Sequence, residues 1–97
     1  MATFVVLLNW TELGIKNYKD SPSRADAFAA EMEKLGGKLK DVYWTLGPYD
    51  AVGVVQAPDD ETITAAMLEI GSRGNTRSTT MRAFTRSEFE GITAKTG

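Results

Sequence analysis

The chain contains no cysteine and no histidine among its 97 residues. Without cysteine it can form no disulfide, no thiolate nucleophile and no cysteine-ligated metal cluster. Without histidine it lacks the base of a Ser-His-Asp triad and the commonest metal-ligating side chain. We therefore expect no metal site and no cofactor. Proton transfer near neutral pH would depend on Asp, Glu, Tyr, Lys or water.

Long apolar runs and an excess of charge are also absent. The apolar start, Met1–Trp10, is too short to span a membrane and lacks the basic residues that begin a signal peptide. Thirteen acidic residues against eleven basic ones give a net charge of −2, which provides no general attraction to nucleic acid or anionic lipid. We expect one cytoplasmic domain over residues 1–97, with no nucleic-acid partner and no membrane partner.

Four segments have the residue pattern of β-strands. Residues 3–10 and 51–56 are apolar at both alternating positions, which is typical of a strand covered on both faces. Residues 38–46 place Tyr43 and Trp44 on opposite faces, because successive side chains in a strand alternate. The last segment, residues 76–84, alternates polar and apolar side chains. The short Gly-Pro link before residue 51 predicts a hairpin between the second and third strands.

Two segments have the pattern of amphipathic helices. Ser21 and Pro22 are typical of a helix start, with the serine as cap, and Gly36–Gly37 is typical of a helix end. Asp59 is the expected cap of the second helix. Each helix has one apolar stripe at three- and four-residue spacing, formed by Ala25, Phe28, Ala29, Met32 and Leu35 in the first and by Ile63, Ala66, Met67 and Ile70 in the second. Residues 11–20 are expected to form a loop with a short helical turn. An amphipathic tail follows the last strand, with Phe89 and Ile92 as its apolar anchors.

The order β-α-β-β-α-β predicts an α+β, ferredoxin-like fold. In this fold a four-stranded antiparallel sheet carries both helices on one face, with the first and third strands in the middle. Those are the two strands that are apolar on both faces, so the face without helices would expose an apolar patch larger than soluble monomers usually show. A second copy of the chain would cover it. We therefore predict a homodimer or a larger homo-oligomer that associates through this face.

Several short motifs occur in an order that resembles a known family. They are Trp10-Thr11, Ser21-Pro22-Ser23-Arg24, Tyr43-Trp44-Thr45-Leu46-Gly47, Gly47-Pro48-Tyr49-Asp50 and Gly71-Ser72-Arg73-Gly74-Asn75. Together they resemble the GYD domain family, named for a Gly-x-Tyr-Asp motif that is Gly47, Tyr49 and Asp50 in this chain. The resemblance implies a ferredoxin-like fold of the dimeric α+β barrel superfamily. It implies no particular reaction, so the catalytic residues are unknown, and fold analogy alone does not supply them.

We expect a ligand, if one binds, to contact Trp10, Tyr18, Gln56 and Arg77. We expect the first and third strands to run in the same direction, which places these residues at one end of the sheet and the Tyr49–Asp50 turn at the other end. The loop after Trp10 is the longest irregular segment, and such loops often cover binding cavities. Its aromatic and basic side chains would suit a small aromatic or carboxylated metabolite. The alternative is that the loop covers the sheet edge, with Trp10 as a buried anchor.

Two classes of function remain open from the sequence. The first is a binding, assembly or regulatory module that holds a small metabolite. The second is a cofactor-independent enzyme of the isomerase, dehydratase or monooxygenase type. Tyr49 and Asp50 could form an acid/base pair for such an enzyme, or they could simply build the hairpin turn. Four arginines, Arg73, Arg77, Arg82 and Arg86, form a basic patch only if they share one surface, and the alternative is that they are solvated or paired with acids.

Overall fold

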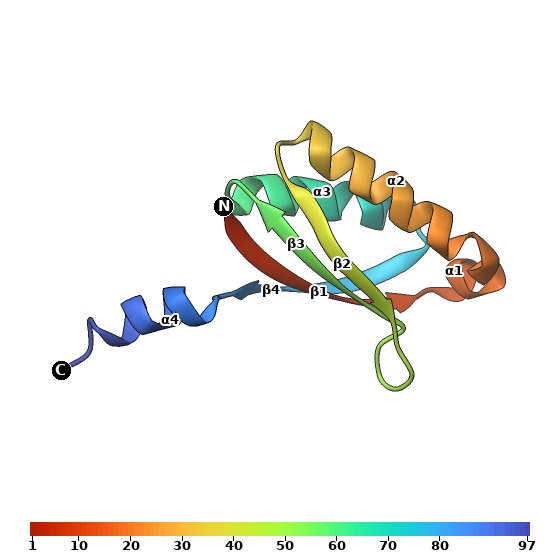
Figure 1. Ribbon diagram of the computed structural model, residues 1–97. Coiled ribbons are helices and arrows are strands. Elements are labelled where there is room, and N and C mark those ends of the chain that lie inside the picture. The colour runs from red at the N-terminus through yellow and green to blue at the C-terminus, as the bar shows by residue number, and fades with distance from the viewer.

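The computed structural model describes all 97 residues, and its main elements follow the predicted order β-α-β-β-α-β (Figure 1). The strands are β1 (Ala2–Trp10), β2 (Lys38–Trp44), β3 (Ala51–Ala57) and β4 (Thr76–Ala83). The helices are α1 (Glu12–Lys16), α2 (Ser21–Lys34), α3 (Asp60–Ser72) and α4 (Arg86–Thr93), with a 3-10 turn at Tyr18–Asp20. None of these helices is both long enough and apolar enough to cross a membrane.

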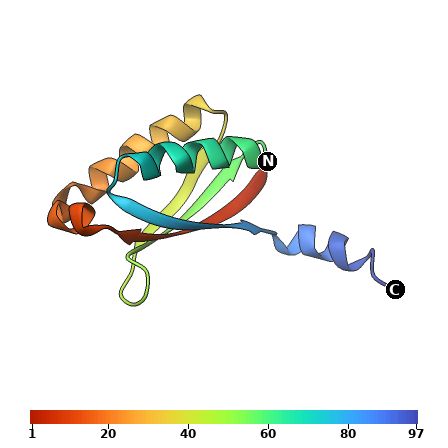
Figure 2. The ribbon, with the colours of Figure 1, turned by 180° about the vertical axis from the view of Figure 1, so that it is seen from behind.

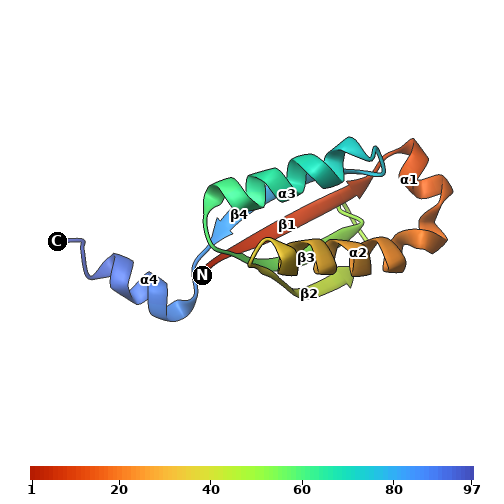
Figure 3. The same ribbon diagram turned by 90° about the horizontal axis from the view of Figure 1, so that it is seen from above.

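The four strands form one antiparallel sheet in the order β2-β3-β1-β4. Helices α2 and α3 both lie on one face of this sheet, and no helix covers the other face (Figures 1 and 2). Seen from above, the two helices run side by side over the strands (Figure 3). The predicted ferredoxin-like α+β fold is confirmed, and β1 and β3 occupy its centre.

The predicted direction of the central strands is wrong. Strands β1 and β3 are antiparallel, with Ala2 opposite Ala57 and Leu8 opposite Ala51. The physical reason is the connectivity, because the crossover through α2 sets β2 parallel to β1 and the hairpin then reverses β3. Gln56 therefore lies opposite Thr3, at the start of β1, while the turn before Ala51 lies beside the end of β1 near Trp10. The predicted common end for Trp10 and Gln56 is incorrect.

The core lies between the sheet and the two helices. It consists of buried apolar side chains from four elements, namely Phe4 and Val6, Phe28 and Met32, Val55 and Ala57, and Ile63 and Ala66. The strand residues of this set alternate along their strands and face the helices, and the helix residues belong to the two predicted stripes. Burial of this apolar surface provides the main favourable free energy of folding.

The two main helices begin differently from each other. Asp59 caps α3 as predicted, and it accepts hydrogen bonds from the hydroxyl and the backbone N–H of Thr62 at 2.6 and 2.8 Å. These bonds lower the pKa of Asp59 because they stabilise its carboxylate, and the bond from the Thr62 hydroxyl has the larger effect. The predicted capping role of Ser21 is wrong, because α2 begins one residue earlier than expected and Asp20 holds the cap position. The Ser21 hydroxyl instead accepts the indole N–H of Trp44 at 2.9 Å.

Residues 11–20 are more regular than the predicted loop. They form α1 and the 3-10 turn, and Thr11 caps α1 by accepting the backbone N–H of Gly14 at 3.1 Å. Thr11 also ties this segment to the start of β4, since its N–H donates to the Asn75 carbonyl at 3.1 Å and its hydroxyl to the Gly74 carbonyl at 2.5 Å. Gly14 is buried in this contact.

Two features mark the edges of the sheet. On β2 the register shifts between Leu39 and Asp41, so Lys40 forms a bulge in the edge strand. Beyond β4, the predicted tail is the helix α4, which points away from the rest of the molecule (Figures 1 and 3). A capping box between Thr85 and Glu88 starts this helix. The hydrogen bond from the Thr85 N–H is the main reason that the pKa of Glu88 is lowered.

Candidate functional site

The turn formed by Gly47, Tyr49 and Asp50 is fastened to the end of β1. The Asp50 N–H donates to the Leu8 carbonyl at 2.8 Å, and the Asp50 Oδ2 accepts the Trp10 N–H at 2.9 Å. Gly47 has a φ of 129°, a conformation that favours glycine. The separation predicted between Trp10 and the Tyr49–Asp50 turn is therefore wrong. The bonds of Asp50 support the structural interpretation of this turn over the acid/base one.

Replacing Asp50 with alanine is expected to lower the free energy of unfolding by about 2 kcal/mol, because a hydrogen bond to a charged acceptor is lost and a half-buried N–H is left unpaired. The Asp50→Asn variant keeps an acceptor oxygen, so its free energy of unfolding should fall by less. Urea denaturation of both variants measures the difference. An Asp50→Ala protein as stable as the parent chain would contradict this role.

The same turn projects from the sheet on the side away from the helices (Figure 1). Leu46 is fully exposed within it, and Tyr49 is half-buried. The hydroxyl of Thr45 donates to the Tyr49 carbonyl at 2.5 Å, which closes the turn.

The four residues predicted to contact a ligand do not converge on one site. Trp10 is half-buried at the end of β1, and Tyr18 is exposed on the 3-10 turn. Arg77 lies opposite Asn9, on the sheet face without helices, and Gln56 lies at the far end of the sheet from Trp10. None of the four lines the cavity described next. Their role in binding stays a prediction.

A cavity of about 110 Å³ lies between the sheet and the two helices. Its walls are mostly apolar and include Val6, Leu8, Phe28, Leu39, Val42, Val55, Met67 and Ile70. Its polar lining comes from the start of α2, the end of β2 and the segment joining α3 to β4, namely Ser21, Arg24, Trp44, Arg73, Asn75 and Thr76. Strand alternation predicts that Tyr43 and Trp44 face opposite ways, and the structure confirms it, with Trp44 on the cavity side.

The two arginines of the cavity differ in their partners. Arg73 forms salt bridges with Glu31 and, at 3.7 Å, with Glu69. The hydrogen bond to Glu31 raises the pKa of Arg73. Arg24 pairs with no carboxylate and donates only to the carbonyls of Asn17 and Gly14, at 3.3 and 3.5 Å. Its guanidinium therefore retains donors that an anion could accept.

Besides Arg24, the cavity lining contains the hydroxyl group of Thr76. Its hydroxyl oxygen is buried and has no hydrogen-bond partner. A buried hydroxyl without a partner destabilises the folded state, and most such groups in proteins are paired. Nothing in the sequence marks Thr76, because it is one of several threonines in β4 and its burial depends on the packing of α3 and the segment before the strand.

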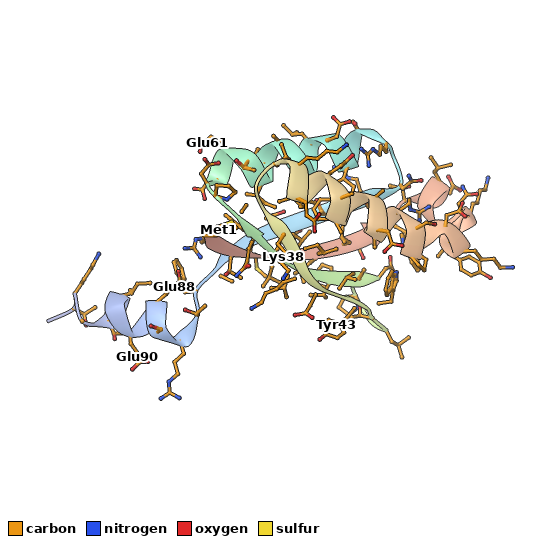
Figure 4. All side chains as sticks on the ribbon, turned by 45° about the horizontal axis from the view of Figure 1, so that its top comes forward. Met1, Lys38, Tyr43, Glu61, Glu88 and Glu90 are labelled. Carbon is orange, nitrogen blue, oxygen red and sulfur yellow. The ribbon has the colours of Figure 1, made fainter.

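The face of the sheet without helices is apolar at its centre. Residues of β1 and β3 that alternate with the core residues point to this face, and their neighbours on the edge strands extend it, so that it comprises Val5, Leu7, Val52, Val54, Tyr43 and Met81. We call these six residues the open face. Tyr43 is 60% exposed and lies on the side of β2 away from the helices (Figure 4). Lys38, Asp41 and Arg77 surround the open face with charge.

The four C-terminal arginines do not form one patch. Arg77 and Arg82 face opposite sides of β4, as strand alternation predicts, since their partners on β1 are Asn9 and Phe4. Arg82 pairs with Glu88 at 3.5 Å, and Arg86 pairs with Glu90 at 3.7 Å. The interpretation of paired arginines is therefore confirmed for these two and for Arg73.

Comparison with solved structures shows the same fold elsewhere. The crystal structure of TTHA0845 from Thermus thermophilus superposes with a TM-score of 0.54 at 25% identity, covering 88% of this chain and 95% of that one. FFRP-DM1 superposes with a TM-score of 0.63 at 19% identity, covering 87% of this chain and all of that one. MtbAldR gives 0.60 at 15% identity, and the match covers 88% of this chain and 54% of that one.

Comparison of sequences is more specific. A protein of Thermus thermophilus named glutamine synthetase and cystathionine beta-lyase binding protein is 38% identical over 84 residues. The match covers 86% of this chain and 88% of the relative. The family model of the GYD domain matches residues 4–93. The resemblance first carried by Gly47, Tyr49 and Asp50 thus extends along almost the whole sequence, and the chain belongs to the GYD domain family.

Proposed function

We propose that the protein is a homodimeric regulatory or assembly module of the cytoplasm that binds a metabolic enzyme. The observation that carries the proposal is the open face, a continuous apolar surface on the two central strands that no element of the chain covers. Exposed apolar surface of this kind marks an interface in a soluble protein. The name of the Thermus relative, a binding protein for two enzymes, supports a role in protein contacts.

A second copy of the chain is the occupant we assign to the open face. Val5 lies opposite Val54 in the middle of the face, and Leu7 lies opposite Val52 beside them. In a twofold dimer the same patch meets itself, so an apolar centre would meet an apolar centre. The surrounding Lys38, Asp41 and Arg77 include both signs of charge, which lets a rotated copy place unlike charges together.

The enzyme is assigned to a different surface. Helix α4 points away from the sheet and carries Phe89 and Ile92, both exposed, so it is available when the open face is covered. An isolated helix of eight residues is marginal in water, and docking of its apolar side would stabilise it. We propose glutamine synthetase or cystathionine beta-lyase as the enzyme, from the partners in the relative's name.

Introducing a charge into the open face tests the dimer. We expect the parent chain to sediment at micromolar concentration with about twice its 10.6 kDa mass, and Val54→Lys to sediment as a monomer because it buries an unpaired charge in the interface. The matched control is Leu68→Lys, since Leu68 is 70% exposed on α3, away from this face. The control should remain dimeric. A parent chain that sediments as a monomer would overturn the dimer.

Binding to purified enzyme tests the second part of the proposal. The immobilised chain is titrated with glutamine synthetase or cystathionine beta-lyase from the organism that encodes this chain. We expect saturable binding to one of them, and Phe89→Ala should weaken that binding while the variant stays dimeric. Absence of binding to both enzymes would overturn this part and leave the sedimentation result unaffected.

The enzyme class expected as an alternative has no structural observation in its favour. Two carboxylates have a lowered pKa, and both serve helix starts: Asp59 caps α3, and Glu88 is the capping-box partner of Thr85 in α4. The cavity lining includes arginine, serine, asparagine and threonine but no carboxylate. The proposal therefore concerns binding.

A further inference from the structure

We propose that the cavity between the sheet and the helices binds a small monocarboxylate with a branched or aromatic hydrocarbon tail. The tail would occupy the apolar part of the cavity, and the carboxylate would lie at its polar end, beside Arg24 and Thr76. This site is on the opposite side of the sheet from the open face, so it does not depend on the dimer or on the enzyme partner.

The volume and lining of the cavity determine the tail. The cavity has a volume of about 110 Å³ and opens partly to solvent, so a small molecule can enter it. Apolar cavities of about 150 Å³ stay dry and bind benzene. A branched aliphatic tail or a single ring is thus the size that fits. Leu8, Phe28, Val42 and Ile70 provide the apolar contacts.

The polar end determines the head group. Arg24 is the arginine of the lining that has no carboxylate partner, and its two bonds to backbone carbonyls are long. A guanidinium matches the two oxygens of a carboxylate with paired hydrogen bonds. The unpaired Thr76 hydroxyl can donate to the same group, which would remove the cost of its burial. The lining contains no carboxylate, and Glu31 beside it is paired with Arg73.

The two parts of the site are held together by the fold. Ser21 and Arg24 lie at the start of α2, Trp44 ends β2, and Thr76 begins β4. These positions all meet at the sheet end where β1 finishes. The hydrogen bond from the Trp44 indole to Ser21 joins β2 to α2 across this end, and the bonds to the carbonyls of Asn17 and Gly14 hold the Arg24 guanidinium at the start of α2.

Titration with matched probes tests the site. The probes are 4-methylpentanoate and benzoate, compared with their uncharged amides, and binding is followed by amide and indole N–H chemical shifts of the full chain. We expect shifts at Leu8, Thr76 and the Trp44 indole, and an affinity for each carboxylate at least about tenfold above that for its amide, because hydrogen bonds to a charged group are the stronger ones. Absence of binding at millimolar concentration, or shifts confined to the open face, would overturn the proposal.

Three variants and one control separate the contributions of the apolar tail, the arginine and the threonine. Val42→Phe should fill the cavity and abolish binding of acids and amides alike. Arg24→Met keeps most of the side-chain stem and should reduce the affinity for the acid to that for the amide, whereas Arg86→Met, at a side chain that is 94% exposed, should change neither. Thr76→Val, of nearly the same shape, should weaken binding of the acids several-fold. Unchanged binding of the amide would show that the Arg24→Met variant is folded. A preserved preference for the acid in that variant would contradict the proposal. Tight binding of the probes to the Val42→Phe variant would contradict it as well.

Discussion

Replacing Gly14 with alanine should lower the free energy of unfolding by about 3 kcal/mol, a large part of the total for a domain of this size. A Cβ atom on Gly14 would lie 1.9 Å from the backbone oxygen of Asn75. The clash is with backbone, so no side-chain rotation relieves it. Relief requires that α1 move away from β4, which breaks the hydrogen bonds that Thr11 makes to Gly74 and Asn75.

The matched control for this substitution is Gly71→Ala. Gly71 lies in α3, and an added Cβ there would meet no atom within 4 Å. Alanine should raise the free energy of unfolding by about 0.5–1 kcal/mol, because glycine is unfavourable inside a helix. Urea denaturation should therefore show changes in the free energy of unfolding of opposite sign for the two variants. Equal stabilities would show that α1 accommodates the extra carbon without cost.

Truncating Met32 to alanine is expected to lower the free energy of unfolding by about 3 kcal/mol, because it removes a long buried side chain and leaves a cavity. Met32 is 0% exposed and belongs to the core cluster. Its terminal methyl also approaches Gly37, where an added Cβ would lie 2.7 Å away, so this side chain fills the space at the end of α2. Thermal denaturation should show a fall in Tm of more than about 10 °C for a domain of this size.

Leu68→Ala is the comparison for Met32. Leu68 lies on the same side of the sheet but is 70% exposed on α3, so its truncation should change the free energy of unfolding by less than about 0.5 kcal/mol. Equal Tm values for Met32→Ala and Leu68→Ala would contradict the assignment of Met32 to the core.

The strands, the two main helices and their order could be predicted because each depends on local pattern. The stripe that includes Phe28 and Met32, and the cap at Asp59, are set by neighbours along the chain. The direction of β3 relative to β1 is a property of the connectivity. The error there placed Gln56 beside Trp10 and separated Trp10 from Asp50, whereas the backbone N–H of Trp10 donates to the Asp50 carboxylate.

The cavity could not be found from the sequence for a different reason. Its polar end brings together Arg24, Trp44 and Thr76, which are far apart in the chain, and no spacing rule links them. An arginine without an acid partner and a threonine without a hydrogen bond can be recognised only when every neighbour is placed. Alternation along β2 correctly predicted that Tyr43 and Trp44 face opposite sides, but it did not say that Trp44 is the one on the helix side.

The bulge at Lys40 has a consequence for how copies of the chain can aggregate. An edge strand offers unpaired N–H and C=O groups that another strand can join, which is the route by which sheets grow without limit. On β2 the bulge interrupts this row of groups, and Lys38, Lys40 and Asp41 place charge along it. A flat strand from another molecule therefore finds no continuous register on which to add, and edge-to-edge growth into fibrils is blocked at this side of the sheet.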